Sequence, residues 1–304
     1  MQRDTGLYRY VPYRGRPRIK WPNGAHVAFW VAPNIEHYEL RPPGSLKRRP
    51  WPRPEPDVLN YSWRDYGNRV GFDRIADTME RHGVRGSVSL NAAICDHFPD
   101  IIERCMELKW EFFGHGIYNT RYMYDLPEED QRLMIRDCRD TIRAKTGQTV
   151  DGWLTPAITS TFETPHILAD EGLIYSLDYF HDDQPLPLNT RGRPMVSVPY
   201  SLEVNDPPLL IWRHTSPRNY VEILKAQFDR LYAEGANNGT VMCIPVHPYV
   251  LGQPIRLPAF AEVLSYITSH EKVWLATGRE IADWYIRHHL DEVSAWMNGL
   301  KGNC

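Results

Sequence analysis

Four ionisable side chains follow apolar segments of the sequence, at positions where buried strands would end. Glu36 closes the apolar run 26–36, His115 follows residues 111–114, and His247 follows residues 239–246. Asp182 comes after a further apolar segment at residues 173–180. Carboxylates and imidazoles are the usual groups for general acid–base catalysis, and they also bind metal ions. Each could instead be a solvated loop residue, or a core residue whose polar atoms are all hydrogen-bonded. It is their shared position after apolar segments that favours a common site.

Alternation of strands and helices predicts how these residues come together. Short apolar runs are typical of buried parallel strands, and they alternate here with segments of helical periodicity. Because the carboxyl ends of parallel strands meet at one edge, the polar residues that follow them are expected to share one site. Strands are expected at residues 26–36, 86–95, 111–118, 150–156, 173–180, 195–201, 209–215, 239–248 and 272–278. Helices are expected at residues 70–83, 100–110, 126–145, 164–172, 220–235, 257–270 and 279–289.

The composition is that of an ordinary globular protein. The chain has 304 residues, of which 42% are hydrophobic and 24% charged, and its net charge is −3 at pH 7. This balance lacks the basic field of proteins that bind nucleic acids or membrane surfaces. The five cysteines form no CxxC pair, and no apolar run approaches the roughly 20 residues that span a bilayer. We therefore expect a cytoplasmic protein with a small-molecule substrate and no nucleic-acid or membrane partner.

One catalytic domain is expected over residues 1–304, with a polar N-terminal arm at 1–26 and a C-terminal tail at 290–304. Residues 41–62 are rich in proline and are not expected to form a regular element. A long insertion directly after a strand is typical of a functional loop or a subunit contact. Leu46, Trp51, Val58 and Trp63 lie in or beside this insertion, and a monomer would struggle to cover them. We therefore predict a homo-oligomer.

Six segments carry a resemblance to a known family. They are NIEHYE after the first strand, YGNRVGFDR at the first helix, and then GHGIYN, GWLTPAITS, SLDYFHDDQPL and VMCIPVHPY, all within residues 27–289. In this order they resemble the polysaccharide deacetylase family (carbohydrate esterase family four, of the NodB-homology type), and more closely its allantoinase-like branch. The resemblance implies a distorted (β/α) barrel with fewer strands than the regular eightfold barrel. It also implies hydrolysis of a C–N bond.

The resemblance also implies roles for particular residues. In metal-using members, two aspartates after the first strand supply a base and a metal ligand, two histidines spaced H-x-x-x-H complete the site, and a later histidine acts as acid. The matching positions here are Asn34, Glu36, His115, Asn119 and His247. Asn34 cannot accept a proton at neutral pH. With Asn119 in place of the second histidine, Glu36, His115 and Asn119 would bind a divalent metal such as zinc only weakly.

These matches give a set of candidate residues. Glu36 is the predicted base or water-positioning group, His247 the acid and His115 the orienting group, with Asp182 or Asp183 as the alternative base. The predicted substrate-binding residues are Asn34, Tyr66, Arg69, Trp153, Thr155, Asp183 and Pro248.

The departures from the metal-using pattern bear on the substrate. Without a tightly bound metal to polarise an acetyl group, the favoured substrate is a small cyclic amide, imide or ureide. The alternatives are a metal-dependent deacetylase of N-acetylated sugars and a catalytically inactive binding protein of the same fold.

Overall fold

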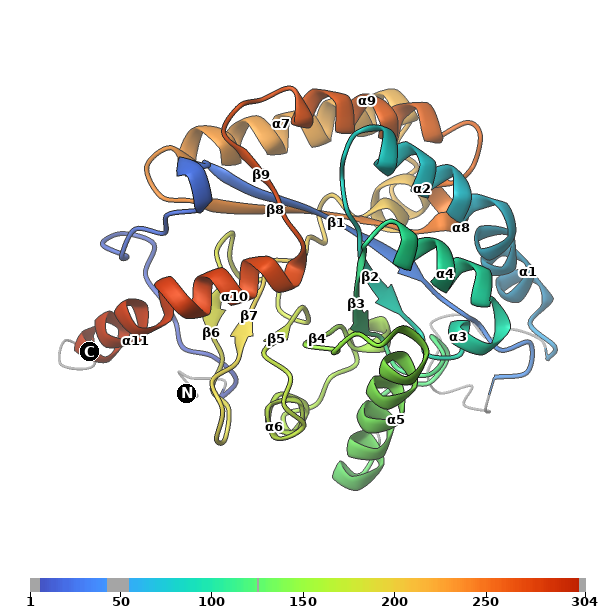
Figure 1. The fold of residues 1–304 in the computed structure, drawn as a ribbon, viewed down its shortest axis with the longest axis horizontal. Coiled ribbons are helices and arrows are strands. Elements are labelled where there is room, and N and C mark those ends of the chain that lie inside the picture. Colours follow the sequence, from blue (N-terminus) through green and yellow to red (C-terminus); the bar gives the residue numbers. More distant parts are fainter. Residues whose placement is uncertain (1–5, 43–54, 125, 301–304) are drawn as a thin grey trace.

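The computed structural model describes residues 6–42, 55–124 and 126–300 (Figure 1). Strand β1 (Val27–Ile35) lies inside the sheet, and all nine of its residues are buried. Its parallel neighbours are β2 (Ser87–Leu90), β8 (Thr240–Val246) and β9 (Val273–Leu275). Burial on both faces explains why this segment is apolar throughout. The remaining strands are β3 (Glu111–Gly114), β4 (Gly152–Trp153), β5 (Tyr175–Ser176), β6 (Leu186–Pro187) and β7 (Val196–Ser197).

Helices connect the strands and cover the sheet. They are α1 (Val58–Tyr66), α2 (Phe72–Arg81), α3 (Ile94–His97), α4 (Pro99–Glu107), α5 (Glu128–Thr146), α6 (Thr164–Asp170), α7 (Pro217–Gly235), α8 (Pro248–Leu251), α9 (Leu257–Thr268), α10 (Gly278–His288) and α11 (Leu290–Gly299). In Figure 1, α7 and α9 lie along one side of β1 and β8, and α10 lies on the other side. Within the described ranges, no helix has the length and apolar character needed to cross a membrane.

The sheet is curled and incompletely closed. Its strand order is β6-β7-β5-β4-β3-β2-β1-β8, and every neighbouring pair is parallel except β6 with β7. The backbone N–H of Val241 in β8 donates to the carbonyl of Asp183 at 2.9 Å, so the segment before β6 runs beside β8. We call this junction the seam. The architecture is the distorted (β/α) barrel predicted from the sequence.

Two of the segments that differ from the sequence prediction lie near the strand ends. Residues 209–215, predicted as a strand, belong largely to a π-helical segment, Pro207–Trp212. Consecutive prolines have no N–H to donate to a sheet, but they suit the first turn of a helix. The predicted helix from residue 70 starts earlier, at Val58, because the Asp57 side chain caps it by accepting from Asn60 N at 3.2 Å. A second π-helical segment, Gly67–Gly71, joins α1 to α2.

The apolar residues behind the predicted oligomer have different surroundings. Leu46 and Trp51 lie outside the described residues. Trp63 packs against Tyr249 of its own chain, with ring centroids 5.1 Å apart, whereas Val58 is 58% exposed. The homo-oligomer therefore stays a prediction.

Two glycines let the π-helical segment Gly67–Gly71 approach α8 closely. A β-carbon on Gly71 would overlap the carbonyl group of Pro248, and one on Gly67 would overlap the backbone N of Tyr249. We expect Gly71→Ala to lower the free energy of unfolding by about 1–3 kcal/mol, because two backbones would have to separate. Urea denaturation measures this. Gly299→Ala, where a β-carbon meets nothing within 4 Å, is the control. Equal stability of the two variants would contradict the expectation.

Candidate active site

Strand register aligns the residues that follow the strand ends. Glu36, Asn91 and His115 follow β1, β2 and β3, and the last residues of these strands are register partners. The three residues therefore form one row just beyond the sheet. On the other side of β1, the register with β8 places His247 beside Asn34. The site thus follows from where four parallel strands end.

Glu36 lies between two imidazole rings. Its Oε1 is 3.7 Å from Nε2 of His115 and 3.4 Å from Nε2 of His247. All three side chains are buried, and the other carboxylate oxygen, Oε2, has no hydrogen-bond partner among the described residues. The structure therefore brings together the three residues that the sequence singles out as base, orienting group and acid.

A buried carboxylate orients His247. Oδ1 of Asp206 is 2.7 Å from Nδ1 of His247, and Oδ2 accepts from the His247 backbone N–H at 2.8 Å. Burial acts to lower the pKa of His247, but the charges of Asp206 and Glu36 and their hydrogen bonds outweigh it and raise the pKa to about 9. His247 is therefore protonated at neutral pH and directs an Nε2–H toward Glu36. We refer to Glu36, His115, His247 and Asp206 as the Glu36 cluster.

A backbone carbonyl group orients the ring of His115. Its Nδ1 is 2.7 Å from the carbonyl oxygen of Leu154, and a carbonyl can only accept, so the proton is assigned to Nδ1. Nε2 therefore faces Glu36 Oε1, at 3.7 Å, a separation longer than a direct hydrogen bond. A water molecule between the two atoms can bond to both. This pair therefore marks a place for a nucleophilic water.

Glu36 is ionised in this setting. Burial acts to raise its pKa, but the two imidazoles, first of all the charge of His247, outweigh it and hold the pKa well below its usual range. The Glu36–His247 pair therefore has the protonation states of a base and an acid at neutral pH.

Several predicted substrate-binding residues are buried near the strand ends and held by protein partners. Asn34 Nδ2 donates to the Tyr200 hydroxyl at 2.9 Å, so Asn34 is fixed as a neutral group beside His247. Thr155 donates to Asp178 from its backbone N and from its hydroxyl, both at 2.7 Å. Trp153 Nε1 donates to Thr155 Oγ1 at 3.1 Å. These contacts build the wall behind the Glu36 cluster.

The aspartate pair lies elsewhere, which corrects its assignment. The Asp183 carbonyl bonds to Val241 near the start of β8, whereas His247 follows the end of that strand. Six residues of strand put these points about 20 Å apart. Asp182 is ion-paired with Arg16 at 2.6 Å. Neither aspartate can replace Glu36 as base, and Asp183 does not bind a substrate held there.

Three further predicted substrate-binding residues have other contacts. The Tyr66 hydroxyl accepts from Arg74 Nη1 at 2.6 Å. Arg69 pairs with Asp65 at 2.6 Å, and its side chain is 68% exposed. The roles of Tyr66 and Arg69 in substrate binding stay predictions. Pro248 is buried where α8 begins, and its contacts with the π-helical segment Gly67–Gly71 make it a packing residue.

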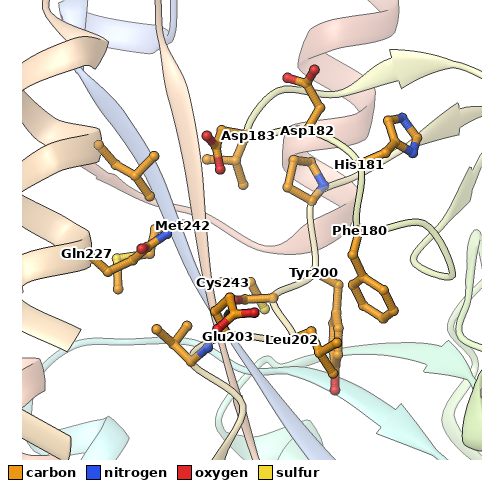
Figure 2. A pocket seen from close by; sticks show the side chains of 15 residues that line it. Phe180, His181, Asp182, Asp183, Tyr200, Leu202, Glu203, Gln227, Met242 and Cys243 are labelled. Carbon is orange, nitrogen blue, oxygen red and sulfur yellow. Dashed lines mark hydrogen bonds between the residues drawn. The ribbon is translucent and has the colours of Figure 1, made fainter. Parts of the chain in front are cut away.

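A cavity of about 400 Å³ lies at the seam. In Figure 2, Asp182 and Asp183 lie at one end of it, and Tyr200 and Leu202 lie toward the other. None of the Glu36 cluster lines it. Its connection to the cluster is through Tyr200, whose hydroxyl bonds to Asn34. The cavity is therefore adjacent to the candidate site and is not part of it.

Comparison with known proteins shows what the chain is similar to. No family model matches the chain. A Schizosaccharomyces pombe protein named as a polysaccharide deacetylase is 25% identical over 300 residues, covering 88% of this chain and 93% of that protein. A Pseudomonas aeruginosa PAO1 structure solved under the same family name superposes with a TM-score of 0.81 at 24% identity, covering 91% of this chain and 96% of the other. The chain is therefore similar to polysaccharide deacetylases over most of its length and shares their fold. PuuE allantoinase is a further structural neighbour, with a TM-score of 0.82, 24% identity, and coverage of 91% and 95% of the two chains.

The donor atoms at the strand ends form a poor site for a divalent metal ion. Among the described residues, no group of three or more His, Cys, Asp or Glu could hold a metal. The predicted set of Glu36, His115 and Asn119 offers one carboxylate, one imidazole and one neutral amide. A metal ion at His247 would have to displace the proton that Asp206 and Glu36 hold on this ring. These donors do not fit a tight zinc site.

Two further candidate residues, Asp206 and Arg64, are not predicted from the sequence. Asp206 precedes two prolines, and an Asp-Pro pair is a helix-start signal, but the apolar residues that follow predict a strand instead. Arg64 lies in α1, which begins within residues 41–62, where no regular element is expected. Its guanidinium lies over the ring of Tyr38, two residues after Glu36, at 4.1 Å from the ring centroid.

Proposed function

We propose that the chain is a hydrolase that cleaves a C–N bond other than a peptide bond, in a small cyclic amide, imide or ureide. The observation that carries the proposal is the position of Glu36 between two imidazoles, one of which, His247, is paired with the buried carboxylate of Asp206. The allantoinase among the structural neighbours supports a cyclic ureide as the first substrate to test.

The cluster supplies each proton transfer that hydrolysis needs. Glu36, with His115 beside it, accepts a proton from water, and the water oxygen bonds to the substrate carbonyl carbon. The C–N bond then breaks, and His247 donates its Nε2 proton to the leaving nitrogen. Asp206 stabilises the charged imidazole before this step and keeps the ring oriented. Asn34 stays neutral throughout.

A cyclic imide or ureide suits this set of groups. Its carbonyl lies next to a nitrogen whose lone pair is shared with a second carbonyl, so the nitrogen leaves more readily than that of a simple acetamide. The carbonyl group of such a substrate therefore needs less polarisation by a metal ion or another electrophile. A second candidate, deacetylation of an N-acetylated sugar, is supported by the name of the S. pombe relative.

A hydrolysis screen tests the proposal. Cyclic imides, hydantoins, ureides and N-acetylated sugars would each be incubated with the protein, with and without EDTA. We expect ring opening that persists in EDTA, because the donor set does not fit a tight zinc site. Acetate release that requires added metal would instead establish the sugar deacetylase. Absence of turnover on every class would favour the inactive binding protein.

A further inference from the structure

We infer that Arg64, Tyr38 and Asn119 form a subsite that binds the carboxylate generated when the ring opens, and that the enzyme thereby selects substrates with an N–H group beside the reacting carbonyl. This inference rests on the proposed function and names the recognition device of the same site. It assigns a specificity role to Arg64, which the candidate residues derived from the sequence do not include.

Arg64 is enclosed by aromatic rings. Its guanidinium carbon lies 4.1 Å from the ring centroid of Tyr38 and 4.5 Å from that of Tyr249. Nη1 donates to Asn60 Oδ1 at 2.8 Å, and Nη2 has only a long contact, 3.4 Å, with the Tyr38 hydroxyl. Nε is buried without a hydrogen-bond partner among the described residues. Donor capacity therefore remains on a rigidly stacked cation.

This cation has no carboxylate partner in the described part of the chain. On the same helix and its continuation, Arg69 forms an ion pair with Asp65, but no ion pair is formed by Arg64. A guanidinium shielded from water is stabilised by an anionic oxygen, since the cost of removing a charge from water is otherwise uncompensated. The unused donors of Arg64 thus favour an oxyanion or a carboxylate as ligand.

Unpartnered acceptors lie next to this donor. Asn119 Nδ2 donates to the Tyr38 hydroxyl at 3.1 Å, so Asn119 and Arg64 both contact the same oxygen. Asn119 Oδ1 and Glu36 Oε2 are buried with no hydrogen-bond partner among the described residues. Donors from Arg64 and acceptors from Asn119 and Glu36 complement a ligand that has a carbonyl or carboxylate oxygen beside an N–H group. A ring-opened ureide has this pattern.

The charges nearby are compatible with an anionic product. Glu36 and Asp206 are the carboxylates of the Glu36 cluster, and protonated His247 lies between them. Arg64 adds a second positive charge on the side of Tyr38. The positive charge of Arg64, which forms no ion pair among the described residues, therefore balances the negative charge of a product carboxylate.

Binding of a product-type probe tests the inference. N-Carbamoylglycine carries a carboxylate and a ureido group. The compound in which a carboxamide replaces that carboxylate is the matched neutral control. Calorimetry with the wild type is expected to show tighter binding of the acid than of the amide. Arg64→Gln should weaken binding of the acid by ~10- to 100-fold and of the amide much less, because one charge-assisted contact is lost. Arg64→Lys should retain part of the preference. Arg218→Gln, with an 88% exposed side chain in the wild type, should bind both compounds as the wild type does.

Other results of these binding experiments would contradict the inference or the proposed function. Equal wild-type affinity for acid and amide, unchanged affinity in Arg64→Gln, or no binding of the acid would overturn the inference. If Arg64→Gln does not fold, as judged by thermal unfolding, the wild-type comparison of acid with amide and the Arg64→Lys variant decide. Failure of every substrate to turn over, with the acid still bound through Arg64, would reject the proposed function and leave the subsite standing.

Discussion

Glu36→Gln is expected to lower kcat by at least ~100-fold on the true substrate, with a much smaller change in KM. The amide keeps the size of the side chain but cannot accept a proton from water, and loss of a general base has an effect of this order. Steady-state kinetics at pH 7 measures it. The carboxylate is ionised there because the effect of the two imidazoles, first of all the charge of His247, outweighs burial and lowers its pKa.

A matched carboxylate provides the control for this substitution. Glu262 is 58% exposed and pairs with Lys225 on the surface of α9, so Glu262→Gln should leave kcat unchanged. If Glu36→Gln retained near wild-type turnover, Glu36 would be structural. The base would then have to be His115, because Asp182 and Asp183 lie at the wrong end of β8.

Asp206→Asn is expected to shift the alkaline limb of kcat/KM downward by at least one pH unit, and so to lower kcat/KM at pH 9 by ~5-fold or more. In the wild type, the pKa of His247 is raised to about 9 by Asp206 and Glu36, against the effect of burial. The acid must be protonated, so activity falls as the pH rises through this pKa. Asparagine can still accept from Nδ1, but it removes the negative charge that stabilises the imidazolium.

The pH profile separates a role in proton transfer from a merely structural one. His247→Asn should remove the alkaline limb together with most of the activity. In the wild type, the raised folded-state pKa means that His247 stabilises the fold fully below its ordinary pKa of 6.5, and that this stabilisation is lost as the pH rises through about 9. An alkaline limb that stayed near pH 9 in Asp206→Asn would show that Asp206 does not set the protonation of His247.

The site residues that lie at the ends of long or central strands could be predicted from the sequence. The apolar run of β1 identifies a buried parallel strand, and the parallel arrangement alone requires Glu36, His115 and His247 to emerge at one edge. No distances are needed for this step. Packing then brings both histidines within 4 Å of the same carboxylate oxygen.

The segment from Asp178 to Asp206 could not be placed in the same way. Its strands β6 and β7 have two residues each and pair in antiparallel fashion, so the chain reverses there and a strand end no longer identifies the edge of the site. Asp182 and Asp183 consequently reach the start of β8, whereas Asp206 reaches His247 at its end. Arg64 was missed because its position depends on a helix stacked against Tyr249, a contact between distant parts of the sequence.

The central claim, hydrolytic opening of a small ring at the Glu36 cluster, is tested most directly by oxygen-18 incorporation. The protein would be incubated in ¹⁸O-labelled water with a hydantoin or a cyclic imide and with an N-acetylated sugar, and the products analysed by mass spectrometry. The account predicts a ring-opened product with one heavy oxygen in its new carboxylate, formed by the wild type and not by Glu36→Gln. Heavy oxygen found only in acetate released from the sugar, or a labelled ring-opened product formed equally by Glu36→Gln, would contradict it.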